Sequence, residues 1–180
     1  MSGLGASPGI VAGRVRILRS PEEGRALADG EILVAPMTNP DWVPTMRRAA
    51  ALVTDGGGMT CHAAIVSREL GVPAVVGTRS ATTRLRNGEL VTVDGRAGAV
   101  YEGDVSAAVA RAAPDRATVS VRPEVVAAPP EPMATKLYVN LAFAARAEEA
   151  ARLPVDGVGL LRAEFMLTDA LQGRHPRALI

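Results

Sequence analysis

The chain has 180 residues and a formal net charge of +1, and 48% of it is hydrophobic but only 3% aromatic. This composition is typical of a globular protein with an aliphatic core. The low charge and scarce aromatic side chains exclude a nucleic-acid-binding surface. One cysteine excludes an internal disulfide. No apolar run approaches the roughly 20 residues of a membrane span, so we expect a cytoplasmic protein without a membrane partner.

The first 50 residues predict two strands and a helix. The strands are expected at 10–18 and 31–35, where apolar residues dominate or alternate with polar ones. A charged, turn-rich segment separates them. Thr38 or Asn39 can then cap a helix, and Pro40 fits its first position.

A strand, a glycine turn, a helix and a second strand are expected next. Residues 50–54 form a short apolar run, and residues 61–70 carry apolar side chains near helical spacing. Gly71 occupies the position of a C-terminal helix cap. Residues 73–76 form another short, buried strand.

The glycine turn places one histidine at a helix start. Gly56, Gly57 and Gly58 let a ligand approach the backbone, and Thr60 can cap the helix. His62 falls in the first turn, where unpaired N–H groups favour anions and disfavour a protonated imidazole. We therefore expect a neutral, nucleophilic imidazole, with the Thr60 hydroxyl serving the ring or a phosphoryl group. The alternative is a capping turn with a solvent-exposed histidine.

The remaining sequence predicts a domain end, a linker and a new unit. A hairpin over 89–101 and a helix over 104–112 close a domain at residues 1–112. The proline-rich residues 113–134 predict a semi-rigid linker. A strand, helix and strand within 135–180 predict a parallel pair, with Arg162 just past the end of its second strand.

Two strings resemble one known family. The string GGMTCHAAIVSRELGVPAVVG at residues 57–77 is similar to the signature of the phosphoenolpyruvate-utilising enzymes. That family includes pyruvate phosphate dikinase, enzyme I of the sugar phosphotransferase system and the phosphoenolpyruvate synthases. Its matching histidine carries a phosphoryl group, so the resemblance implies this role for His62. The triplet Thr60-Cys61-His62 is the form typical of the synthases.

The second string, GVGLLRAEFM at residues 157–166, resembles the second strand of the family's phosphoenolpyruvate-binding barrel. There the matching arginine contacts the substrate phosphate, so the resemblance implies this role for Arg162; a guanidinium suits phosphate by its planar fork. The expected fold is α/β: a swivelling β/β/α phosphohistidine domain, a linker, and the first βαβ unit of an incomplete (β/α)8 barrel.

The resemblance implies phosphoryl transfer from ATP through phosphohistidine to pyruvate, yielding phosphoenolpyruvate, AMP and phosphate. It also implies Mg²⁺, with ligands outside this chain. The ATP-binding domain and most of the barrel are missing, so we expect a fragment that has no dikinase activity alone. Alternatives are a non-catalytic carrier acting in trans, or a relative of the dikinase or of enzyme I. His175 has no assigned role.

Overall fold

The computed structural model describes residues 1–112 and 134–171 of the chain. The chain divides into two compact units, Met1–Arg116 and Ala117–Ile180, and each is described separately. The predicted linker at 113–134 lies almost wholly outside the described residues, as does His175. The predicted domain boundaries therefore stay predictions.

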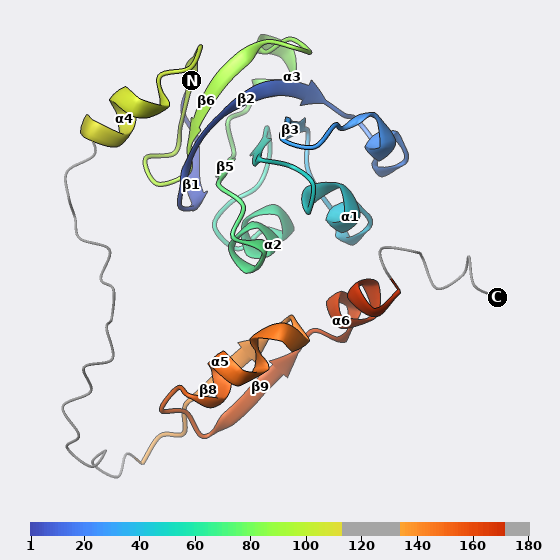
Figure 1. Ribbon diagram of the computed structural model, residues 1–180, viewed down its shortest axis with the longest axis vertical. Helices are drawn as coiled ribbons and strands as arrows, with labels where there is room; N and C mark the ends of the chain where they lie inside the picture. The colour runs from blue at the N-terminus through green and yellow to red at the C-terminus, as the bar shows by residue number, and fades with distance from the viewer. Residues whose placement is uncertain (113–133, 172–180) are drawn as a thin grey trace. The chain divides into compact units, whose positions relative to one another are not determined.

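The first unit is built on one curled, mixed sheet of seven strands (Figure 1). The spatial order is β1-β5-β4-β3-β2-β6-β7, with β2, β3, β4 and β5 parallel and the outer strands antiparallel to their neighbours. The strands are β1 (Leu4–Ser7), β2 (Ile10–Ile17), β3 (Ile32–Ala35), β4 (Ala51–Thr54), β5 (Ala74–Val76), β6 (Leu90–Asp94) and β7 (Ala99–Glu102).

The two edges of this sheet meet at the N-terminus. Ser2 forms an isolated bridge with Ala99. The Met1 ammonium donates to the Val100 carbonyl at 2.7 Å, and the Gly3 N–H donates to the Gly98 carbonyl at 2.8 Å. These contacts join the β1 end to β7 and curl the sheet around its core.

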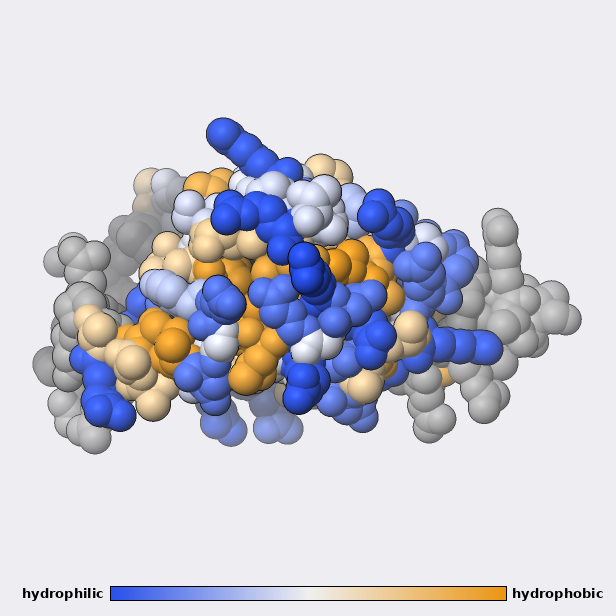
Figure 2. All heavy atoms as spheres, turned by 90° about the horizontal axis from the view of Figure 1, so that it is seen from above, coloured by the Kyte–Doolittle hydropathy of each residue, from blue (hydrophilic) through white to orange (hydrophobic). Residues whose placement is uncertain are grey.

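Strands β3, β4 and β5 are buried on both faces, which is why their sequences are continuous apolar runs. One face carries the cluster that contains Val34, Val53 and Val75, together with Ala81 and Leu85 from the region of helix α3 (Ala81–Arg84). The opposite face carries the alternate residues of these strands, and helix α2 (His62–Leu70) contacts β1, β5 and β4 there. Seen from above, the surface shows hydrophilic side chains interspersed with apolar ones (Figure 2).

The helices of the first unit are short. Asn39 caps a 3-10 turn by accepting from the Asp41 N–H at 3.1 Å, with Pro40 in the first position as predicted. Trp42 is buried and belongs to the core. The elements are 3-10 turns η1 (Pro21–Ala26) and η2 (Pro40–Trp42), and helices α1 (Val43–Met46), α2 (His62–Leu70), α3 (Ala81–Arg84) and α4 (Ser106–Ala112).

The second unit confirms the predicted parallel strand–helix–strand arrangement. Its elements are β8 (Tyr138–Leu141), η3 (Ala144–Arg146), α5 (Ala147–Ala151), β9 (Gly157–Leu161) and α6 (Ala163–Ala170). Two paired strands are described here, so the predicted barrel stays a prediction. Among the described residues, no helix has both the length and the apolar character needed to cross a membrane.

Candidate functional site

The candidate site lies at the carboxyl edge of β3, β4 and β5. These strands are parallel neighbours, with Ala35 paired to Thr54, so the loops that follow them lie together. Ligands of α/β sheets commonly bind at this edge. Backbone hydrogen bonds join the three loops: the Gly56 N–H donates to the Pro36 carbonyl at 2.9 Å, and the Gly77 N–H to the Gly56 carbonyl at 3.3 Å.

The three glycines after β4 have different structural roles. Gly57 has φ +104°, and a Cβ there would lie 2.6 Å from the Cys61 Sγ, so only glycine fits. Gly58 has open space around it. Because the Gly56 N–H already donates to Pro36, the phosphate cradle predicted for Gly56, Gly57 and Gly58 can use the N–H groups of the last two only.

His62 is the first residue of α2, as the sequence predicts. Its helix begins at an extended N-cap, Cys61, which makes no side-chain capping bond. The expectation that Thr60 caps the helix is therefore wrong, because Thr60 lies one residue earlier in an exposed turn. The first N–H groups of a helix have no intrahelical acceptor, so the His62 backbone lies at an anion-binding position. Gly71 ends α2 at φ +69°, as predicted.

The imidazole of His62 contacts a residue that sequence reasoning missed. Thr38 Oγ1 lies 3.0 Å from His62 Nδ1, although the two residues are 24 positions apart. Thr38 is 6% exposed and follows β3, next to the glycine loop. The direction of the bond depends on the tautomer: a protonated Nδ1 donates to the hydroxyl, whereas an unprotonated Nδ1 accepts from it. The sequence carried one signal for this contact: Thr38 is a polar residue that follows the buried strand β3.

A second set of hydrogen bonds supports the base of the glycine loop. The Asp55 carboxylate accepts from the Thr82 N–H at 3.0 Å and from the Thr82 hydroxyl. The Thr78 hydroxyl donates to the Thr54 carbonyl at 3.0 Å. A hollow of about 800 Å³ borders this region, with Gly56, Gly57, Arg79 and Arg84 in its lining.

The other predicted site residue, Arg162, belongs to the second unit. It directly follows β9, and its N–H donates to the Leu141 carbonyl at 2.9 Å. Its position past a strand end is therefore as predicted, while its contact with a substrate phosphate stays a prediction. Within residues 1–112 and 134–171, no group of three or more His, Cys, Asp or Glu side chains could hold a metal ion.

Comparisons with known proteins find one family that is similar to this part of the chain. The family model of the PEP-utilising enzyme mobile domain matches residues 27–98. The phosphoenolpyruvate synthase of Pyrococcus furiosus is 51% identical over 176 residues, which are 98% of this chain and 21% of that protein. The phosphoenolpyruvate synthase of Aeropyrum pernix is 47% identical over 186 residues, covering 99% of this chain and 22% of that protein.

The chain thus spans about a fifth of the length of these curated relatives. Among solved structures, an NMR solution structure of Enzyme I has 32% sequence identity and a TM-score of 0.41, over 47% of this chain and 36% of that chain. The family match includes β3, β4, β5 and the whole His62 site, and the sequence similarity extends over nearly the entire chain. Residues 27–98 match the mobile domain of the PEP-utilising enzymes, and nearly the whole chain is similar to phosphoenolpyruvate synthases.

Proposed function

We propose that His62 carries a phosphoryl group between two active sites of a larger phosphoenolpyruvate synthase. The observation that supports this most is the contact between Thr38 Oγ1 and His62 Nδ1, made at the N-terminus of α2 directly after the glycine loop. The contact orients the ring beside backbone N–H groups that favour an anion. The names of the relatives favour a synthase over the other family members.

The proposed chemistry uses the second ring nitrogen. When Nδ1 carries the proton and donates a hydrogen bond to the Thr38 hydroxyl oxygen, Nε2 has the free lone pair and is the nucleophile. Nε2 attacks phosphorus, the new N–P bond forms, and the bond from phosphorus to its leaving group breaks. Positive charge develops on the imidazole during the attack. The hydrogen bond from Nδ1–H to the Thr38 oxygen becomes stronger as this charge grows, which stabilises the transition state.

In the whole protein, we propose that ATP phosphorylates His62 and that pyruvate accepts the group to become phosphoenolpyruvate. The second unit is then the start of the phosphoenolpyruvate-binding barrel, and Arg162 binds the substrate phosphate. Mg²⁺ and the ATP-binding domain belong to parts of the protein outside this chain. These assignments rest on the resemblance of the two motifs and on the synthase relatives.

The carrier role is tested with phosphoramidate, a small phosphoryl donor that releases ammonia on transfer to histidine. The 180-residue chain and its His175→Ala variant should acquire one acid-labile phosphate, and His62→Ala should acquire none. Tandem mass spectrometry and ³¹P NMR locate the label. Equal labelling of His62→Ala, or labelling of His175 in the unaltered chain, would disprove the carrier role.

The synthase assignment needs a second experiment. This chain replaces the matching segment of the Pyrococcus furiosus relative, and AMP formation from ATP and pyruvate is measured. The chimera should form AMP in a pyruvate-dependent manner, and His62→Ala should abolish it. A folded chimera that phosphoramidate labels, but that forms no AMP, would argue for a carrier of another family member.

A further inference from the structure

The start of α2 lacks the side-chain cap that usually holds such a turn. Cys61 is the N-cap and makes no capping bond through its side chain, whereas a usual N-cap side chain accepts a hydrogen bond from a backbone N–H of the first turn. Met59 and Thr60, just before it, are exposed. Because His62 follows this turn directly, the orientation of its ring depends on what holds the turn in place.

Arg68 makes such a contact. It lies in the last turn of α2, and helical side chains point back toward the N-terminus. Its Nη2 donates to the Met59 carbonyl at 2.9 Å, and its Nη1 donates to the Ala6 carbonyl in β1 at 3.1 Å. One guanidinium thus joins the turn before His62 to the edge strand on which α2 packs.

We propose that Arg68 is a positioning residue for the phosphoryl carrier, which rests on the proposed function of His62. Its fork holds the Met59 carbonyl and thereby the turn over residues 59–61, so that His62 keeps its contact with Thr38. A guanidinium with two donor nitrogens can bind the Met59 and Ala6 carbonyls at the same time. We expect the single ammonium group of a lysine to form a good hydrogen bond with only one of these carbonyls. Arg68 thus acts on His62 indirectly, through the backbone of the turn that it holds.

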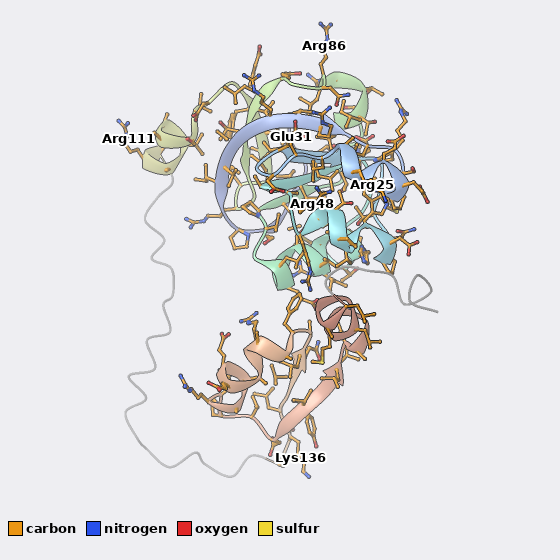
Figure 3. The ribbon with its side chains drawn as sticks, turned by 45° about the vertical axis from the view of Figure 1, so that its right-hand side comes forward. Arg25, Glu31, Arg48, Arg86, Arg111 and Lys136 are labelled. Atoms are coloured by element: carbon orange, nitrogen blue, oxygen red, sulfur yellow. The ribbon has the colours of Figure 1, made fainter. Side chains whose placement is uncertain are left out.

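The chain contains a matched control for this proposal. Arg48 is also exposed and also donates to two backbone carbonyls, those of Leu27 at 2.9 Å and Gly24 at 2.5 Å. It follows α1 and ties the α1 end to the η1 region (Figure 3). Arg48→Gln therefore removes the same kind of interaction from the same unit without touching the turn before His62.

The experiment compares Arg68→Gln, Arg68→Lys and Arg48→Gln in the full chain, using phosphoramidate labelling, urea unfolding and NMR of the ¹⁵N-labelled imidazoles. The chain has two histidines, so the His175→Ala variant assigns the His62 ring. We expect Arg68→Gln to slow labelling roughly ten- to a hundredfold, since small misplacements of a reacting group have effects of this size. Its His62 ring resonances should move, and Arg68→Lys should recover part of the rate.

Arg48→Gln should lose similar stability while keeping the labelling rate and ring resonances of the unaltered chain. The proposal is wrong if Arg68→Gln labels as fast as Arg48→Gln, or if Arg68→Lys labels like the unaltered chain, because charge alone would then suffice. It is equally wrong if neither Arg68 variant folds. If the unaltered chain is not labelled at His62, the carrier role fails, while the ring resonances still decide whether Arg68 positions the imidazole.

Discussion

Replacing Thr38 by valine tests the central contact of the site, because it removes the hydroxyl 3.0 Å from His62 Nδ1 and keeps a β-branched side chain of similar shape. Thr38 is 6% exposed, so water does not readily take the place of the lost oxygen. The ring would then lose its orienting partner on the Nδ1 side. We expect phosphoryl transfer to slow while the fold is retained.

The size of the effect follows from the kind of hydrogen bond. A neutral bond contributes about 0.5–1.5 kcal/mol net, and one to a charged group about 1.5–3 kcal/mol. The imidazole is neutral before attack and gains positive charge during it, so the transition state loses the larger amount. Only the difference between the two states changes the barrier, and a difference of about 1–1.5 kcal/mol slows transfer roughly five- to thirteenfold. The unfolding free energy should change by only about 1 kcal/mol.

The assay is the initial rate of phosphoramidate labelling, with urea unfolding measured in parallel. Thr38→Ser retains a hydroxyl and should recover most of the rate. Thr60→Val tests the earlier expectation that the Thr60 hydroxyl serves the ring or the phosphoryl group, since the structure brings Thr38 to Nδ1 instead. If Thr38→Val labels at the unaltered rate while Thr60→Val is slow, our interpretation of the Thr38 contact is refuted.

Two further predictions concern stability. Gly57→Ala should lower the unfolding free energy by about 1–3 kcal/mol, because Gly57 has φ +104° and its new Cβ would lie 2.6 Å from Cys61 Sγ, whereas Gly58→Ala meets nothing within 4 Å; equal urea midpoints for the two variants would contradict this. Glu31 is labelled in Figure 3. The Arg16 guanidinium donates to both Glu31 carboxylate oxygens (2.9 and 2.8 Å) and thereby lowers the pKa of Glu31 below its ordinary 4.5. The stabilisation is therefore complete above the unfolded pKa and disappears as the pH falls through the lower folded pKa. Glu31→Gln should be less stable than the unaltered chain at pH 7, and the difference between their urea midpoints should shrink in acid; a difference that does not vary with pH would exclude this explanation.

The sequence by itself determined the local frame of the site. The glycine turn, the helical spacing and Gly71 predicted α2 and placed His62 in its first turn, and the structure confirms both. The apolar runs predicted β3, β4 and β5, because parallel strands covered on both faces leave no polar alternation. These features depend on backbone conformation and periodicity, which neighbouring residues control. The family motif, at residues 57–77, includes the glycine turn, α2 and β5.

Only the tertiary structure decided which side chains meet. Thr38 read as a possible helix cap, yet the parallel pairing of β3 and β4 brings it to His62. Arg68 was not singled out from the sequence, because its reach depends on where β1 and the Met59 turn lie. β1 itself was not predicted, since its glycine-containing sequence becomes a strand by pairing with β5, some 70 residues later. Such contacts depend on strand order and register, which local periodicity does not encode.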